Sequence, residues 1–227
     1  MVAYSIEQWL LFFYIYCFLG WCFESTYVSL CKGHRVNRGF LKAPFLPLYG
    51  SGAILMLIIG LIFGENTLWI YLAGVVAATV LELVTGAGME LLYRIKYWDY
   101  SNQRFNFKGH ICLTSSIAWG FFTLLVIRVI HRPIETFVFG LPRSVVLGSV
   151  VVLTVVLVWD FVVSFKAAWD LRSLILKLED MYKNVKKDTP GLKEIKEQIA
   201  DICEHIQAEL TARYEVRLSK LYEFTRQ

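Results

Sequence analysis

The stretch from Leu68 to Arg94 constrains the fold of this chain more than any other part of the sequence. It is apolar and longer than the roughly 20 residues that a helix needs to cross a bilayer, yet it contains Glu82 near its middle and Glu90 near its end. Small or acidic residues recur along it at every fourth position: Gly74, Ala78, Glu82, Gly86 and Glu90. On a helix this spacing makes one stripe, and small residues allow a neighbouring helix to come close. We therefore predict that the stripe faces protein and not lipid.

Other apolar runs of similar length place this stretch in a polytopic membrane protein. The chain has 227 residues, of which 56% are hydrophobic, and a mean hydropathy of +0.51, which is too apolar for a soluble domain of this size. The hydrophobic runs predict five transmembrane helices, at residues 11–30, 46–63, 68–94, 111–130 and 145–165. The predicted fold is an all-α membrane helical bundle. A loop containing Pro133 and Pro142 is expected between the last two helices, and no N-terminal signal peptide is evident.

Basic residues in the loops indicate the orientation of the bundle, because short cytoplasmic loops are enriched in Lys and Arg. Loops 31–45 and 94–110 carry four each and the segment after residue 165 carries twelve, whereas loop 64–67 carries none. This distribution predicts a multi-pass protein of the cell membrane, with its N-terminus outside and its C-terminus in the cytoplasm. The same loops explain the net charge of +4, so the charge does not indicate a nucleic-acid partner.

The segment 167–227 differs in composition from residues 1–166, and we predict that it forms a separate cytoplasmic tail. Its apolar residues repeat at helical spacing up to a break at 188–191. From 192 to 206 they step by three and four as in a coiled coil, and 210–221 prolong the pattern less regularly. The tail is expected to be an amphipathic helical hairpin or coil. It either packs on itself or joins the chain to a second copy or to a partner protein.

Acidic side chains inside the predicted spans are candidates for a ligand site. A charge at the bilayer centre costs about 2.5–3.5 kcal/mol on insertion scales, so such an acid indicates a function or a specific partner. Apart from Arg94 and Arg128 near the ends of their spans, the predicted spans hold no Lys or Arg, so the acids must be protonated, paired with loop arginines or matched by a bound cation. Aromatic faces nearby offer cation–π contacts. The candidate ligand-binding residues are Glu24, Tyr27, Arg35, Arg38, Tyr49, Glu82, Glu90, Trp98, Tyr100, His110 and Asp160.

Each candidate also has a purely structural interpretation. Glu24 and Glu82 can form hydrogen bonds between helices, and Glu90 can pair with Arg94 one turn later. His110 can cap a helix. The aromatic residues of the loop after the third span can form the aromatic belt of a membrane interface, and the basic loop after the first span can act only as a topology signal. The sequence alone leaves these alternatives open.

Several chemistries lack their sequence motifs. The chain contains no GxxxxGK[ST], HExxH or GxSxG motif, and no pair of histidines lies in a span to hold haem. The five cysteines show no CxxC spacing, and four of them lie in or beside predicted spans, where Cys commonly packs as a small apolar residue. We expect no cofactor. Whether the chain is an enzyme, and whether it binds a metal, stays open at this point.

Two long blocks of the sequence resemble a known family. They read GWCFESTYVSLCKGHRVNRGFLKAPFLPLYGSGA, from Gly20, and YWDYSNQRFNFKGHICLTSSIAWG, from Tyr97. They are similar to the ABC-transporter type IV family, often labelled CmpB-like, and the resemblance covers about residues 10 to 165. It implies a multi-pass protein of the bacterial cell membrane. It brings no established catalytic residues, and within an ABC system the ATPase would have to be another chain.

Three functions are compatible with these features. The leading hypothesis is a transport-type protein, a permease component whose first, third, fourth and fifth spans form a cytoplasm-facing pocket. There Glu24, Glu82 and Asp160 would bind a proton, a cation or a cationic small molecule. The second is an integral membrane enzyme acting on a lipid or isoprenoid headgroup, with loop arginines holding a phosphate. The third is a membrane scaffold or sensor that signals through the C-terminal coil.

Overall fold

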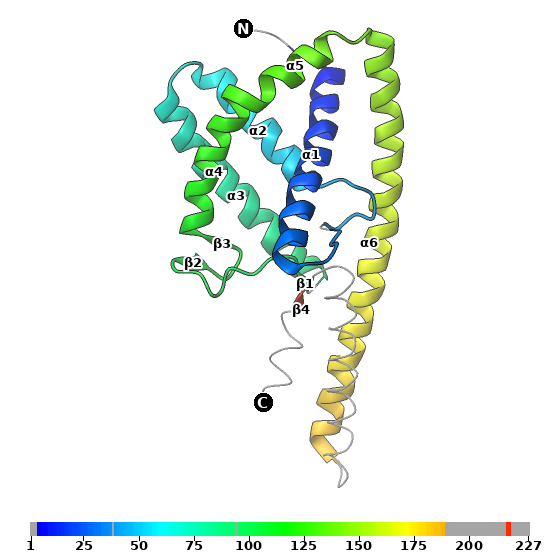
Figure 1. The fold of residues 1–227 in the computed structure, drawn as a ribbon. Helices are drawn as coiled ribbons and strands as arrows, with labels where there is room; N and C mark the ends of the chain where they lie inside the picture. Colours follow the sequence, from blue (N-terminus) through cyan, green and yellow to red (C-terminus); the bar gives the residue numbers. More distant parts are fainter. Residues whose placement is uncertain (1–3, 38, 94, 189–216, 219–227) are drawn as a thin grey trace.

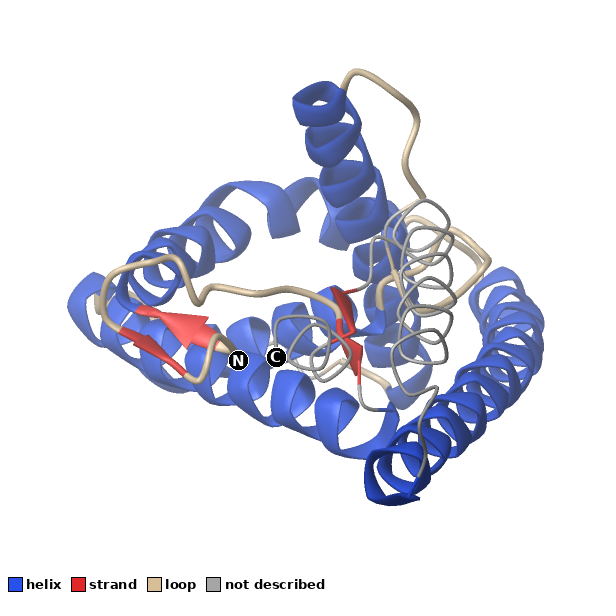
Figure 2. Cartoon of the chain, turned by 90° about the horizontal axis from the view of Figure 1, so that it is seen from below, coloured by secondary structure: helices blue, strands red, loops and turns tan. Residues whose placement is uncertain are grey.

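The structure, a computed structural model, describes residues 4–37, 39–93, 95–188 and 217–218 and is mostly helical (Figure 1). Its helices are α1 (Ile6–Lys32), α2 (Pro47–Phe63), α3 (Thr67–Tyr93), α4 (Leu113–Leu125), the π-helical turn η1 (Val126–Ile130), α5 (His131–Phe139) and α6 (Arg143–Asp188). Its strands are two residues each: β1 (Ile95–Lys96), β2 (Asn106–Phe107), β3 (Ile111–Cys112) and β4 (Arg217–Leu218). Pairing of β2 with β3 makes a small hairpin at one end of the bundle (Figure 2).

Within the described residues, four helical segments are long and apolar enough to cross a membrane: Ile6–Cys31, Thr67–Tyr93, Leu113–Phe139 and Arg143–Asp170. The shorter apolar helix α2 has 17 residues, about 25 Å at 1.5 Å per residue. The prediction of an all-α membrane bundle is therefore confirmed. That α2 is a fifth span stays a prediction.

Helix α1 has capping residues at both ends, and α2 begins with a residue typical of a first helical turn. Ser5 caps α1, since its hydroxyl accepts a hydrogen bond from the Gln8 amide and the Gln8 side chain accepts one from the Ser5 amide. Gly33 ends the helix in the left-handed conformation, at φ 72°. In α2, Pro47 takes the first helical turn, where its missing amide proton costs nothing.

The stripe on α3 is buried, as the sequence predicts. Gly74, Ala78, Glu82 and Gly86 are buried, whereas Val76, Val80 and Val84 on another face are exposed, as side chains that face lipid should be. Gly74 allows α4 to come close, because a Cβ there would lie 2.3 Å from the Thr123 hydroxyl. Gly120 on α4 has the same role, since its Cβ would lie 2.6 Å from the ring of Tyr71.

The segment after α4 differs from the prediction, because the expected loop with Pro133 is helical. The chain continues from α4 through η1 into α5, and Pro133 lies in the first turn of α5. A proline removes one helical hydrogen bond and its ring crowds the carbonyl four residues earlier. That carbonyl belongs to Val129 in η1, and the wider π turn accommodates the ring.

Helix α6 runs without a break from Arg143 to Asp188, so the fifth predicted span and the first tail helix are one helix (Figure 1). It lies beside α1, to which it is linked by the hydrogen bond of 2.7 Å between the Tyr14 and Thr154 hydroxyls. The second predicted tail helix lies outside the described residues, apart from Arg217–Leu218. These two residues were expected to be helical, but they form β4 and pair with β1.

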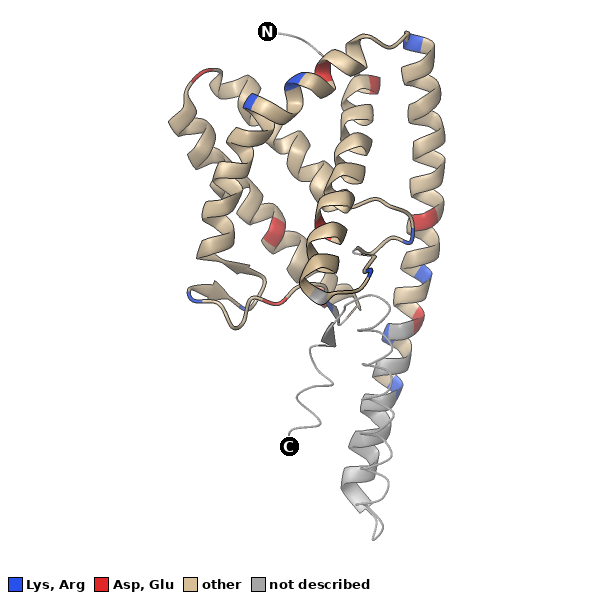
Figure 3. Ribbon diagram, in the orientation of Figure 1, with Lys and Arg blue, Asp and Glu red and all other residues tan. Residues whose placement is uncertain are grey.

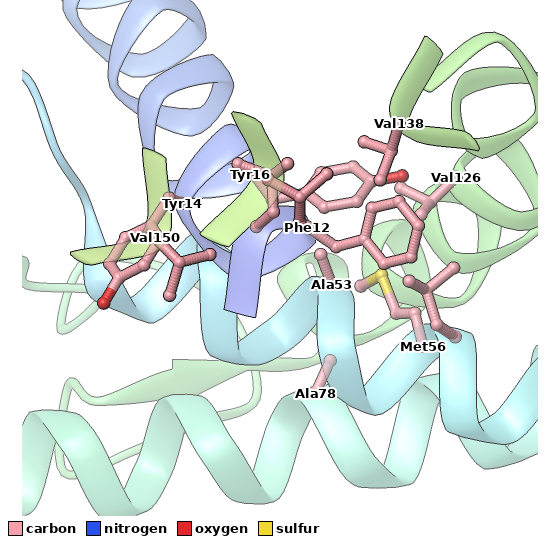
Figure 4. Packing of buried hydrophobic residues seen from close by; sticks show 12 residues of the cluster. Phe12, Tyr14, Tyr16, Ala53, Met56, Ala78, Val126, Val138 and Val150 are labelled. Atoms are coloured by element: carbon pink, nitrogen blue, oxygen red, sulfur yellow. The ribbon is translucent and has the colours of Figure 1, made fainter. Parts of the chain in front are cut away.

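An apolar layer fills the middle of the bundle (Figure 4). Phe12 of α1 is fully buried there against side chains of α2, η1 and α5. The other labelled members are Tyr14, Tyr16, Ala53, Met56, Ala78, Val126, Val138 and Val150. We call the end of the bundle where β2 and β3 lie the hairpin end, and the end where α5 lies the α5 end (Figure 1).

Candidate functional site

Glu82 is the centre of a polar cluster toward the hairpin end. Its side chain is 5% exposed, and its carboxylate accepts hydrogen bonds from the Tyr100 hydroxyl at 3.0 Å, the Ser115 hydroxyl at 3.0 Å and the Trp119 indole at 3.1 Å. All three donors are neutral. Hydrogen bonds of this kind stabilise the charged form of a carboxylate, whereas burial disfavours it. We call Glu82 and its three donors the Glu82 cluster.

The cluster is assembled from three parts of the chain that the fold brings together. Helix α3 presents Glu82 on its buried stripe, and α4 presents Ser115 and Trp119 one turn apart on one face. Tyr100 comes from the loop between β1 and β2. Burial and the charge of Glu82 raise the pKa of the Tyr100 hydroxyl, so this residue keeps its proton and remains a donor.

Glu24 extends the cluster toward α1 and α2. Its carboxylate accepts a hydrogen bond of 2.7 Å from the Tyr49 hydroxyl, and the Tyr49 ring meets the Trp119 ring edge-on at 6.0 Å. Gly20 makes the approach of Tyr49 to α1 possible, because a Cβ there would lie 2.3 Å from that of Tyr49. The charges of Glu24 and Glu82 interact, so the two acids belong to one electrostatic site.

A small cavity lies beside Glu82. It measures about 20 Å³, which is room for a water molecule or two, and its walls are mostly apolar. The lining residues come from α2, α3 and α4: Leu48, Tyr49, Gly52, Ala53, Met56, Ala78, Leu81, Glu82, Trp119 and Phe122. A site of this size fits a proton carried on water or a small inorganic ion, and it does not fit an organic cation in this conformation.

Three other predicted residues form a second group over the C-terminal half of α3. Glu90 pairs with His110 Nε2 at 3.1 Å, and the Trp98 indole donates to the His110 carbonyl at 2.8 Å. Gly86 leaves the space that they fill, since a Cβ there would lie 3.0 Å from Trp98 and 3.2 Å from His110. These contacts fix the loop 97–112 on α3 and with it the position of Tyr100 above Glu82.

The remaining predicted residues lie elsewhere. Asp160 is buried on α6 and accepts a hydrogen bond of 2.8 Å from the Ala43 amide, so its contact is with the loop before α2. Tyr27 is 60% exposed and Arg35 is exposed. Arg38 lies outside the described residues. The expected pocket of spans one, three, four and five thus differs from the structure, in which α2 lines the cavity.

The charges of the bundle are distributed unequally between its ends (Figure 3). At the α5 end, Arg128 pairs with Glu65 and Arg143 with Glu7, at 3.1 Å for the second pair. Among the residues that the structure describes, no Lys or Arg forms an ion pair with Glu82. In the same residues no group of three His, Cys, Asp or Glu side chains is placed to hold a metal ion.

Two of the three donors to Glu82, Ser115 and Trp119, are not among the residues predicted from the sequence. Ser115 and Trp119 are four residues apart in an apolar span, a spacing that puts both on one face of a helix. A search for polar pairs at helical spacing in the spans would have found them. It would not have shown which acid they face.

A family model described as Putative ABC-transporter type IV matches residues 11–165, more than half of the chain. The match includes all of the Glu82 cluster as well as Glu24, Tyr49 and Asp160. Comparison with curated proteins and with solved structures finds no match. The chain belongs to the family of the Putative ABC-transporter type IV proteins.

Proposed function

We propose that this protein is a transport-type protein of the cell membrane in which Glu82 and Glu24 form an intramembrane binding site for a proton or a small inorganic cation. The observation that carries the proposal is the buried Glu82 carboxylate, held by three neutral donors and next to a cavity of about 20 Å³. A buried carboxylate is costly to keep charged without a positive partner, binding of a proton or cation removes this cost, and intramembrane acids commonly mark ion or proton pathways.

The pair of acids supports a single positive ligand. The charge of Glu24 disfavours a charge on Glu82, and this repulsion falls when a proton or cation binds at Glu82. Loop 97–112 covers the site through Tyr100, and the Glu90–His110 pair holds this loop on α3. We infer that the ligand enters from the hairpin end when this loop moves.

The same charge pattern supports an orientation. Basic residues of loops 33–46 and 95–112 and of the α6 extension lie at the hairpin end, so we propose that this end faces the cytoplasm and the N-terminus lies outside (Figure 3). The extension of α6 beyond Asp170 then projects into the cytoplasm, where it offers a surface for a second copy or a partner protein.

The proposal is tested by ion flux into proteoliposomes that contain the full chain. A pH-sensitive dye reports proton flux, and dyes for Na⁺ and K⁺ report the two alternatives under an imposed gradient. We expect flux of one of these ions above that of empty vesicles, and a loss of at least about tenfold in Glu82→Gln, since removal of a charge partner at an ion site typically costs 1–3 kcal/mol or more.

The matched control is Glu65→Gln, the same change at an acid that is 92% exposed at the α5 end. It should transport like the wild type. If Glu82→Gln fails to fold, Tyr100→Phe tests the site, because this change removes one donor and keeps the ring. Wild-type flux equal to that of empty vesicles, or equal flux in wild type and Glu82→Gln, would contradict the proposal.

A further inference from the structure

A second buried polar centre lies at the α5 end, and nothing in the proposed function uses it. His131, at the start of α5, is 6% exposed. Its Nε2 lies 3.2 Å from the Tyr4 hydroxyl and its Nδ1 lies 3.1 Å from the Tyr16 hydroxyl. The Tyr4 hydroxyl in turn donates to Glu135. More than 100 residues separate α5 from both tyrosines in the sequence, so the fold brings the three parts together.

The hydrogen bonds fix where the protons of this centre lie. Tyr4 has one hydroxyl proton and donates it to Glu135, so its oxygen can only accept from His131 Nε2. A neutral imidazole carries one N–H, so Nδ1 is then the acceptor for the Tyr16 hydroxyl. Burial and the contact with Glu135 raise the pKa of Tyr4, which therefore keeps its proton as a donor.

Few other charges face His131. On its own helix the acidic neighbour is Glu135, while Arg132 is exposed. On α1, Glu7 pairs with Arg143 of α6, and in η1, Arg128 pairs with Glu65. Helix α2, which also packs on η1, carries no Lys, Arg, Asp or Glu along Pro47–Phe63. The other close partner of the imidazole is the ring of Phe12, edge-on at 4.9 Å.

We propose that His131 is a proton-binding site at the α5 end of the bundle, and that uptake of a proton breaks its contact with Tyr16. The proton adds to the lone pair of Nδ1, which becomes an N–H donor. The Tyr16 hydroxyl can then no longer donate to the ring, so it must turn away and accept instead. Glu135, linked through Tyr4, supplies the negative charge that balances the imidazolium.

This site is distinct from the Glu82 site. Phe12, which contacts the imidazole, and Ala53 and Met56, which line the cavity beside Glu82, belong to one buried apolar cluster that lies between the two sites (Figure 4). His131 is therefore expected to respond to the pH on the side of the membrane that the α5 end faces.

The test is magnetic resonance of the full chain with ¹⁵N-labelled histidine and ¹³C-labelled tyrosine in lipid. The chain has four histidines, and the His131 signal is assigned by its coupling to the two tyrosine hydroxyl carbons and by its loss in His131→Gln. At about pH 8 we expect the Nε2–H tautomer. Between about pH 8 and pH 5, the range in which histidine titrates, a second N–H should appear reversibly.

Three further outcomes sharpen the test. Tyr4→Phe should remove the preference for the Nε2–H tautomer in the neutral protein because it removes the acceptor of that N–H, whereas Tyr14→Phe, whose hydroxyl contacts Thr154 of α6, should not. In oriented proteoliposomes with a pH gradient, the His131 signal should follow the pH of the compartment that the α5 end faces. An Nδ1–H tautomer, no second N–H down to about pH 5, or a His131 signal that follows the opposite compartment would overturn the proposal. None of these results depends on ion flux or on Glu82, so the two proposals fail independently.

Discussion

The Glu82 cluster and the His131 centre are both buried, both rely on tyrosine hydroxyls, and they differ in what their partners do. Around Glu82 the three partners all donate, so they stabilise a negative charge that burial disfavours. Around His131 the ring donates to one tyrosine and accepts from the other, so a change of proton number forces a change of hydrogen bonds. The first arrangement suits the binding of a positive ligand, and the second suits a response to pH.

Replacement of Glu82 by leucine should have the largest effect on stability. The change removes the acceptor for Tyr100, Ser115 and Trp119, and each buried donor left unsatisfied costs about 1–3 kcal/mol. We expect the free energy of unfolding to fall by about 3 kcal/mol or more. The measurement is thermal unfolding followed with a thiol-reactive dye, in which the buried thiols of Cys17 and Cys112 should react at a lower temperature than in the wild type. Glu82→Gln keeps an acceptor oxygen and should lose much less. Equal losses in both variants would show that the donors do not depend on this side chain.

Tyr100→Phe should have the second-largest effect on stability. The hydroxyl donates to a charged carboxylate, and such hydrogen bonds contribute about 1.5–3 kcal/mol. The same thermal assay measures the loss, and ion flux should fall with it because the loop that covers Glu82 loses its contact. Full stability in Tyr100→Phe would mean that the loop is held only by the Glu90–His110 pair.

Tyr16→Phe should have a smaller effect than Tyr100→Phe. Its hydroxyl donates to a neutral imidazole nitrogen, and a neutral hydrogen bond contributes about 0.5–1.5 kcal/mol. The loss should be present at high pH and should shrink as the pH falls and His131 is protonated, because the contact is then already broken. Thermal unfolding at several pH values measures this. A loss that is the same at all pH values contradicts the proton-linked contact.

Arg128→Ala should have the smallest effect. Its partner Glu65 is largely exposed, and exposed ion pairs contribute about 0–1 kcal/mol. The small loss should vanish in high salt, because the surrounding solution screens the pair. A loss as large as that of Tyr16→Phe would show that the α5 end depends on its surface charges more than on its buried hydrogen bonds.

The sequence predicts the Glu82 site better than the His131 centre for a physical reason. An acid in an apolar span is conspicuous because lipid penalises it, and its period of four with Gly74 and Ala78 places it on a buried face. Tyr4, Tyr16 and His131 lie near the ends of predicted helices, where polar and aromatic residues are ordinary. Their contacts depend on how helices far apart in the sequence pack, which periodicity does not encode.

The fold shows the same division between local and non-local information. Helices α1, α2 and α3 follow from apolar runs with the capping signals of Ser5, Gly33 and Pro47. The helical course through Pro133 was missed because a π turn is a response to local crowding and has no periodic signal. Asp160 was predicted to line the pocket because it lies at a depth in its span similar to that of Glu24. Depth in the membrane does not show which neighbour a helix faces.

The most direct test of the proposed site is infrared difference spectroscopy of the carboxyl C=O stretch. The spectra are recorded on the protein in lipid while the solution that faces the hairpin end is acidified. The wild type and the control Glu65→Gln should both show a carboxyl band appear as Glu82 takes up a proton, and Glu82→Gln should lack it. The band should move in Tyr100→Phe, because one of its hydrogen bonds is removed. If sodium or potassium is the ligand, its addition should shift the carboxylate bands of the same residue instead. Identical difference spectra for wild type and Glu82→Gln, for protons and for both cations, would contradict a positive-ligand site at Glu82.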